Sequence, residues 1–170
     1  PVVKGGGGTK RRTIDLILEL RRAANAIQGR LDEKGIALVL PSESKGLVRV
    51  EIRPENLQRV LMVLFNNSMD WLHRTKKPRI TITVDPEFSD RQCAIVVSDN
   101  GPGIPDRIAD CAFEAAETGR EGSRGMGLTI ARNIVEGVAG TIEILKDGRR
   151  KGAAIRILLP RKRTRTVNRS

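Results

Sequence analysis

The chain has 170 residues, of which 39% are hydrophobic and 30% are charged, so it has the composition of one folded domain and not of a disordered or fibrous chain. Its apolar runs are far shorter than the roughly 20 residues that cross a bilayer, and it begins with no secretory leader. We therefore expect a cytoplasmic domain that makes no membrane contact. Its two cysteines, Cys93 and Cys111, lack the spacing of a zinc site and are expected to be reduced thiols.

The net charge points to a class of partner. Lysine and arginine number 31 against 20 acidic residues, which gives a formal charge of +11. Such a balance favours a partner that carries phosphate, whether a nucleotide, a nucleic acid or a phosphoprotein. The chain has no tyrosine, three phenylalanines and one tryptophan, so few rings are present to stack on bases. Nucleic acid is therefore not the expected main partner, although the basic runs 149–151 and 161–163 keep a nucleic-acid-binding module as a third hypothesis.

The pattern along the chain divides it into a central domain and two ends. Residues 1–12 contain a run of four glycines and are expected to form a flexible linker or an artificial junction. Residues 161–170 carry five basic groups and no core pattern, so we expect a basic tail there. Between them, residues 13–160 show the periodicities of a single domain. In chain order we expect a helix over 13–34, strands over 36–40 and 48–52, a helix over 54–74, strands over 79–84 and 92–98, a helix over 126–138, and a hairpin of strands over 141–145 and 153–159.

This interleaving of helices and strands predicts an α/β fold. The second helix must end before Pro78, because a residue ahead of proline is disfavoured in helical geometry. The segment RITITV (79–84) alternates as a half-buried strand does. Together the elements indicate a two-layer α/β sandwich whose mixed, mostly antiparallel sheet carries helices on one face.

Three segments carry the polar residues that a ligand would need. On the second expected helix, Asn67, Asp70 and Trp71 share one face beside the core. The pentapeptide DNGPG (99–103) follows a buried strand directly, and its glycines let a flat ligand approach the backbone. The third segment, GSRGMGL (122–128), places glycines before a helix start, where backbone N–H groups can hold phosphate. Each segment alone also has a plain structural explanation, namely a polar helix rim, a tight turn and a mobile loop.

Taken together and in this order, the segments resemble the ATP-binding catalytic domain of sensor histidine kinases. That domain is a member of the GHKL superfamily, shared with DNA gyrase, mismatch-repair ATPases and heat-shock chaperones, and the resemblance covers about residues 13–160. The matching segments are LQRVLMVLFNNSMDWL (57–72) for the N box, DNGPG for the first glycine box, CAFE (111–114) for the F box, and SRGMGLTIARNIVE (123–136) for the second glycine box.

The resemblance implies a role for each matched residue. Asn67 would hold Mg²⁺ through its side-chain oxygen, which suits a metal that prefers oxygen ligands. Asp99 would accept the amino group of adenine and so select ATP over GTP. The remaining matched residues would lie against the nucleotide, with Gly101, Gly103 and Ile104 at the base and Gly125, Met126, Gly127 and Leu128 at the phosphates.

Five further residues near these motifs have less defined roles. Trp71 is either a stacking platform for the base or a core filler. Asp70 matches a position where many relatives outside the kinases carry Asp. Arg120 and Arg124 are either lid residues that meet the β- and γ-phosphates or plain solvated arginines. His73 is expected to be a surface residue and not a phosphoacceptor.

Three departures from the family pattern bear on activity. Val63 stands four residues before Asn67, where hydrolysing relatives carry a general-base Glu and kinases usually carry Asn, and valine can neither activate water nor bind metal. The F box continues as FEAA (113–116), where relatives typically show Phe-x-Pro-Phe. Ala153 follows Gly152 where relatives often have Thr, which removes one hydroxyl near the pocket. We therefore expect nucleotide binding to tolerate these changes better than phosphotransfer.

The expected function is that of the catalytic domain of a histidine protein kinase, which binds ATP with Mg²⁺ and transfers the γ-phosphoryl group to a histidine. The resemblance puts that histidine on an upstream dimerisation domain and implies a response regulator as a further partner. The alternative is a nucleotide-responsive GHKL switch domain without kinase activity, which Val63 and the altered F box favour.

Overall fold

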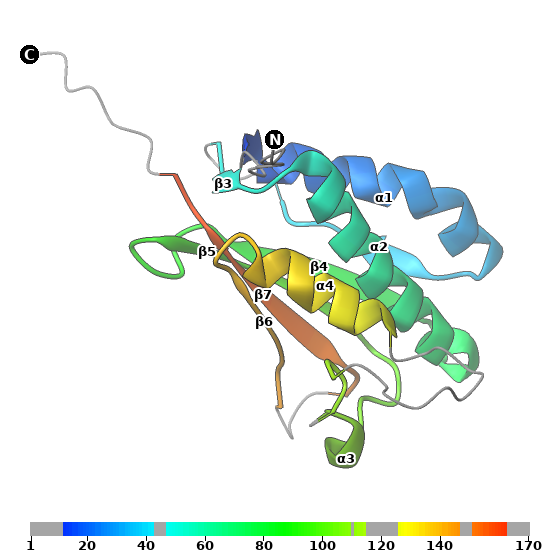
Figure 1. The fold of residues 1–170 in the computed structure, drawn as a ribbon. Coiled ribbons are helices and arrows are strands. Elements are labelled where there is room, and N and C mark those ends of the chain that lie inside the picture. The colour runs from blue at the N-terminus through cyan, green and yellow to red at the C-terminus, as the bar shows by residue number, and fades with distance from the viewer. Residues whose placement is uncertain (1–11, 43–46, 110, 115–125, 147–150, 163–170) are drawn as a thin grey trace, which may run out of the picture.

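The computed structural model describes residues 12–42, 47–109, 111–114, 126–146 and 151–162. Its elements are, in chain order, β1 (Thr13–Asp15), α1 (Leu16–Glu33), β2 (Ala37–Val39), β3 (Arg49–Glu51), α2 (Pro54–Trp71), the 3-10 turn η1 (Leu72–Arg74), β4 (Arg79–Asp85), β5 (Gln92–Asp99), α3 (Asp106–Ala109), α4 (Met126–Glu136), β6 (Thr141–Ile144) and β7 (Ala154–Pro160). Helices α1, α2 and α4 lie on one side of a five-stranded sheet (Figure 1). The expected two-layer α/β sandwich is thus confirmed.

The five-stranded sheet has the strand order β2-β4-β5-β7-β6. β2 runs parallel to β4, and the other three neighbouring pairs are antiparallel, so the sheet is mixed and mostly antiparallel as expected. Because β5 and β7 are antiparallel neighbours, the end of β5 meets the start of β7. There the backbone N–H of Asp99 donates to the carbonyl oxygen of Ala153 at 2.9 Å. This end of the sheet brings the DNGPG segment next to the closing strand.

The hydrophobic core lies between the sheet and the helices. Alternate residues of the central strands point into it, and Ile95 and Ile157 are completely buried. The spacing of residues over 54–74 predicts one buried stripe, and α2 and η1 bury all of it, namely Leu57, Val60, Leu61, Leu64, Ser68 and Leu72. Each large apolar side chain of such a stripe contributes about 1.5–3 kcal/mol through its burial. The stripe therefore fixes the rotation of α2, and with it the direction of the polar residues near its C-terminal end.

The first helix begins later than predicted. Residues 13–15 form the strand β1, which pairs antiparallel with β3 in a separate two-stranded sheet. The helix starts at Leu16 because Asp15 caps it, and its carboxylate accepts hydrogen bonds from two first-turn N–H groups at 3.0 and 3.4 Å. Ile14 packs against the core from β1. A single apolar residue fits a helical stripe and a three-residue strand equally well, so spacing did not separate the two.

Two other helices end earlier than predicted. Helix α2 stops at Trp71 and continues as a 3-10 turn, and the chain then reverses at Lys77, whose φ is +51°. Helix α4 stops at Glu136, and Ala139 takes a φ of +60°. A positive φ cannot continue a right-handed helix, and it accompanies a typical helix C-terminus. The predicted strands agree with the structure within two residues at each end.

The structure covers only part of the two predicted ends. Residues 1–11 and 163–170 lie outside the described residues. Arg161 and Lys162, at the start of the expected tail, are bonded to the domain, since their backbone N–H groups donate to the carbonyl oxygens of Arg91 and Arg49 at 2.9 and 3.0 Å. Within the described ranges, no helix combines the length and the apolar character that crossing a bilayer requires.

Candidate functional site

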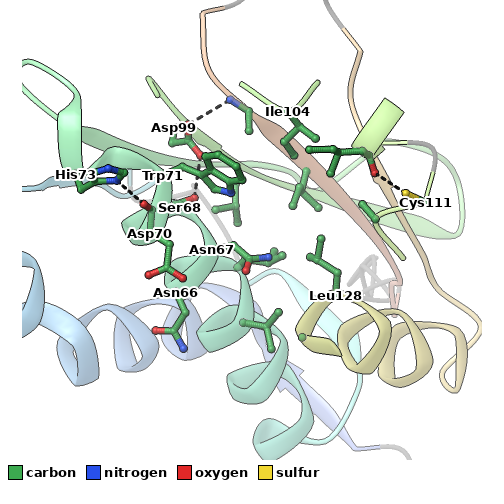
Figure 2. Close-up of a pocket in the computed structure, with 18 of the residues that line it drawn as sticks. Asn66, Asn67, Ser68, Asp70, Trp71, His73, Asp99, Ile104, Cys111 and Leu128 are labelled. Atoms are coloured by element: carbon green, nitrogen blue, oxygen red, sulfur yellow. Dashed lines mark hydrogen bonds between the residues drawn. The ribbon is translucent and has the colours of Figure 1, made fainter. Parts of the chain in front are cut away.

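A cavity of about 740 Å³ opens between the C-terminal half of α2, the segment after β5, the start of α4 and the start of β7 (Figure 2). Its wall is mainly apolar, with a few polar groups, which is the usual composition of a small-molecule site. The structure thus brings three motifs that are distant in sequence to one cavity. Of the predicted site residues, Asn67, Asp70, Trp71, Asp99, Ile104, Gly127 and Leu128 line it.

Asp99 is the most buried ionisable group in this cavity, with 9% of its surface exposed. Its Oδ1 accepts the backbone N–H groups of Gly101 at 3.0 Å and Ala153 at 3.2 Å. Its Oδ2 accepts the hydroxyl of Ser68 at 3.0 Å. Asp99 takes part in none of the ion pairs of the described chain, so hydrogen bonds and not a cation balance its charge. Each carboxylate oxygen has two lone pairs, so Oδ2 can accept one more hydrogen bond from a ligand.

Glycines allow the backbone to close around Asp99. A Cβ on Gly101 would stand 3.0 Å from Asp99 Oδ1, and Gly103 has a φ of +86°. Gly152 has a φ of +102°, and a Cβ on it would overlap the main chain of Asp99. Gly101 and Gly103 line a second hollow of about 760 Å³, and Ile104 lines both cavities. The structure therefore places Gly101 beside Asp99 and Gly103 beside Gly152, and neither of them lines the first cavity.

Asn67 and Val63 lie one helical turn apart on α2, and both line the cavity. Figure 2 shows Asn67 and Leu128 pointing from α2 and α4 toward the same space. Val63 packs against the first turn of α4, because a Cβ on Gly127 would stand only 3.2 Å from Val63 Cγ1. An apolar side chain thus occupies the position beside Asn67, and Gly127 is the residue that permits the two helices to approach there.

Trp71, Asp70 and His73 form the outer rim of the cavity. Trp71 is 38% exposed and lines the cavity, so it is not a core filler. The Asp70 carboxylate is exposed. The backbone carbonyl oxygen of Asp70 lies 2.8 Å from Nδ1 of His73, which is also exposed. The predicted surface position of His73 is therefore correct, although the residue also borders the cavity.

The opposite wall is built by α3 and the segment that follows it. Ile108 and Cys111 line it, and the thiol of Cys111 contacts the Ile108 carbonyl oxygen at 3.6 Å. Phe113 of the expected F box packs on the core, and its carbonyl oxygen accepts the hydroxyl of Thr129 in α4 at 3.2 Å. The F-box segment is thereby attached to the helix that begins at the second glycine box. The other cysteine, Cys93, is buried in β5, and burial raises its pKa to about 12.

Several predicted site residues cannot be placed. Arg120, Arg124 and Gly125 lie outside the described residues, as does the whole segment 117–124 that was expected to form a lid. For Met126, the structure describes the backbone at the start of α4. The roles expected for these residues stay predictions.

Two residues of the site were not recognised as functional from the sequence. Ser68 was assigned to the core stripe of α2, and it is buried, but its hydroxyl donates to Asp99. Ala153 was noted only for the hydroxyl that it lacks, whereas its backbone N–H is a donor to Asp99. A polar residue on an otherwise apolar stripe was the available signal for Ser68, because a buried hydroxyl needs a partner. No sequence signal identifies a backbone donor such as that of Ala153.

The residues of the cavity suit a metal that arrives with a nucleotide. Within the described ranges, no group of three or more His, Cys, Asp or Glu side chains could hold an ion by itself. Asn67 offers a neutral amide oxygen next to the apolar Val63. Mg²⁺ commonly takes few protein ligands and completes its shell with phosphate oxygens and water. The donor set therefore fits Mg²⁺ bound to a triphosphate.

Comparison with known proteins gives the family. The family model described as "Histidine kinase-, DNA gyrase B-, and HSP90-like ATPase" matches residues 52–163. The sensory histidine kinase/phosphatase NtrB of Salmonella typhimurium is 37% identical over 97 residues, which is 53% of this chain and 28% of that protein. The chain therefore belongs to the family of histidine kinase-, DNA gyrase B- and HSP90-like ATPases, and it spans about a quarter of the length of this relative.

Solved structures show the same fold. The catalytic domain of the histidine kinase ThkA has a TM-score of 0.75 at 21% identity, with 88% of this chain and 95% of that chain covered. The structure of ThkA in complex with the response regulator TrrA has a TM-score of 0.72 at 20% identity, with 89% of this chain and 42% of that chain covered. The structure of full-length ShkA in complex with AMPPNP has a TM-score of 0.74 at 19% identity, with 91% of this chain and 32% of that chain covered. At these identities the likeness concerns the fold, which agrees with the family assignment.

Proposed function

We propose that this chain is the ATP-binding catalytic domain of a histidine protein kinase, and that the cavity between α2, α4 and the end of β5 holds ATP with Mg²⁺. The observation that carries the proposal is that Asp99 and Asn67, from motifs 32 positions apart by their numbering, line one mainly apolar cavity. The match to the family model and the AMPPNP complex of ShkA, a structure of the same fold, support the choice of ligand.

Each residue of the cavity has a defined part in this proposal. Oδ2 of Asp99 accepts a hydrogen bond from the amino group of adenine. Within the part of the chain that the structure describes, this oxygen has one partner, Ser68, and can accept another hydrogen bond. The half-exposed ring of Trp71 covers one side of the base. Backbone N–H groups at the start of α4, from Gly127 and Leu128, face the phosphates, where the positive end of the helix favours anions.

Asn67 would hold Mg²⁺ through its side-chain oxygen together with the triphosphate, and the bound metal would supply positive charge to the phosphoryl oxygens. The protein contributes mainly position and electrostatics, because phosphoryl transfer needs little covalent work from it. Arg120 and Arg124 are proposed as cations that approach the β- and γ-phosphates.

The phosphoryl group passes in this proposal to a histidine on an upstream dimerisation domain, and a response regulator then receives it. The complex of ThkA with a response regulator supports this class of partner. Because ATP is a cytoplasmic metabolite, the proposal keeps the cytoplasmic location that the sequence suggested.

The test is a titration of the chain with magnesium ADP, comparing the parent with Asp99→Asn. An amide at this position presents a donor as well as an acceptor, so we expect affinity to fall by roughly ten- to hundredfold. Asp70→Asn is the matched control, since its exposed carboxylate lies on the rim, and it should change affinity little. Equal affinities of parent and Asp99→Asn would remove the central assignment.

A second candidate function is a nucleotide-responsive switch without phosphotransfer. The packing of Val63 against Gly127 favours it, because this apolar contact fills the position beside Asn67 from which a second polar group would act. Incubating the full-length protein with radiolabelled ATP separates the two candidates. Acid-labile label on the protein supports the kinase, and nucleotide binding without label supports the switch.

A further inference from the structure

The hydrogen bonds of Asp99 divide unevenly between its two oxygens. Both backbone donors, from Gly101 and Ala153, reach Oδ1, at 3.0 and 3.2 Å. Oδ2 has one partner in the described part of the chain, the hydroxyl of Ser68 at 3.0 Å. A carboxylate accepts and cannot donate, so the serine must be the donor. Ser68 is therefore the group that holds Oδ2, the oxygen with the greater remaining capacity to accept a hydrogen bond.

The two partners also hold the carboxylate from different elements. Ser68 lies on α2 with 7% of its surface exposed, and Asp99 ends β5. Turning the carboxylate about the Cβ–Cγ bond would move both oxygens, so the bond to Oδ2 from α2 restricts this rotation further than the two bonds to Oδ1 do alone. Both residues are at least nine-tenths buried, so the bond between them lies inside the protein and not at its outer surface.

Position 153 bears on the same carboxylate. The backbone N–H of Ala153 bonds to Oδ1, and the residue lines the cavity, so a hydroxyl on its Cβ would lie next to Asp99. This chain has a methyl group there and a hydroxyl on α2 instead. Only one side-chain hydroxyl, that of Ser68, contacts Asp99 among the described residues.

We propose that Ser68 is a positioning residue that turns the Asp99 carboxylate toward the amino group of adenine and supplies the hydroxyl that position 153 lacks. The inference rests on the proposed function, since it takes adenine to be the base that Asp99 receives. It goes further by naming the residue that positions Asp99 for the selection of a 6-amino purine.

The experiment compares ADP with purine riboside diphosphate, which lacks the 6-amino group, both with Mg²⁺. In the parent chain, ADP should bind more tightly. In Ser68→Ala, ADP affinity should fall by roughly five- to twentyfold while the affinity for the purine analogue stays within about twofold, so the preference for ADP narrows. A second variant, Ser68→Ala with Ala153→Thr, should recover most of the preference.

Each possible result tests a different part of the proposal. An equal loss for both nucleotides would mean that Ser68 only packs α2 against β5, and an unchanged ADP affinity would mean that it does not position Asp99. If the double variant preferred ADP over the purine analogue no more than Ser68→Ala does, the compensation between positions 68 and 153 would be contradicted. These three results leave the proposed function standing, whereas a parent chain that binds neither nucleotide would remove the function and this inference together.

Discussion

Gly152 lies directly against the main chain of Asp99. A Cβ on Gly152 would overlap the carbonyl oxygen of Asp99, and the glycine has a φ of +102°, which side-chain-bearing residues rarely adopt. Gly152 therefore lets the segment that leads into β7 approach the end of β5. The position of the Asp99 carboxylate depends on this contact as much as on its own hydrogen bonds.

The first prediction concerns this contact. Gly152→Ala should lower the free energy of unfolding by about 2–4 kcal/mol, because the added methyl group must push away backbone and not a flexible side chain. It should also weaken the binding of magnesium ADP, since Asp99 would move. Thermal or urea unfolding and a nucleotide titration measure the two effects.

Gly29→Ala provides the matched control. Gly29 lies on the exposed side of α1, and a Cβ on it meets nothing within 4 Å. Alanine is the better helix former, so this variant should be more stable by about 0.5–1 kcal/mol. If Gly152→Ala were as stable as Gly29→Ala, the close contact between Gly152 and the main chain of Asp99 would be contradicted.

The fold could be predicted from the sequence because each element carries its own periodic signal. The alternation of RITITV identified β4, and the three-four spacing of α2 identified its buried face, including Ser68. The strand β1 was missed because three residues with one apolar side chain give no period, and the pairing with β3 that creates the strand is a long-range contact.

The site was predictable to a different extent. Asn67 and Asp99 could be named because side-chain chemistry is visible in the sequence, and the structure places both in one cavity. The backbone N–H of Ala153 and the close approach of Gly152 could not, because they depend on how β5 and β7 pair and not on residue type. The hydroxyl of Ser68 had a residue-type signal, but its partner is 31 positions away.

The second prediction concerns Val63. In Val63→Asn a side-chain oxygen would lie one helical turn before Asn67 on the wall of the cavity. Mg²⁺ prefers oxygen ligands, so the ratio of ATP affinity with Mg²⁺ to that without it should rise by roughly three- to tenfold. Isothermal titration with and without a chelator measures this ratio.

Val63→Ala controls for the packing against Gly127, since it removes the same methyl groups and adds no oxygen. Its ratio should equal that of the parent, although its stability should fall by about 1–2 kcal/mol. A rise of the same size in both variants would mean that more room, and not a metal ligand, improves binding.

The third prediction uses the cysteine at the rim of the cavity. Cys111 is exposed, whereas Cys93 is buried and its pKa is raised to about 12 by desolvation and by the charge of Asp85. The thiolate is the form that reacts, so iodoacetamide at pH 8 should modify Cys111 and leave Cys93 intact in the folded chain. Because Cys111 lines the cavity, saturating magnesium ADP should slow this modification several-fold.

Mass spectrometry of the labelled chain checks both parts of this prediction. Cys111→Ser should take up no label when folded and one label per chain when denatured. A labelling rate of Cys111 that does not change with nucleotide would show that the ligand binds elsewhere, and label on Cys93 in the native state would contradict its burial.

The fourth prediction is a pH dependence of stability. The pKa of Cys93 is raised from 9.0 to about 12 in the folded chain, so its neutral thiol stabilises the fold fully below pH 9. This contribution is lost as the pH rises from 9 toward 12, with a slope of at most about 1.4 kcal/mol per pH unit. The chain has no tyrosine, so in this range the lysines are the main other side chains that titrate.

Urea unfolding between pH 8 and 11 tests this dependence in the parent chain, in Cys93→Ala and in Cys111→Ala. Cys93→Ala should lose about 1 kcal/mol at pH 8 through the smaller side chain, and its free energy of unfolding should then fall less steeply as the pH rises. Cys111→Ala keeps the buried thiol, so it should retain the slope of the parent. Equal slopes in all three proteins would mean that the lysines alone cause the alkaline loss, and that the buried thiol of β5 does not oppose its own ionisation.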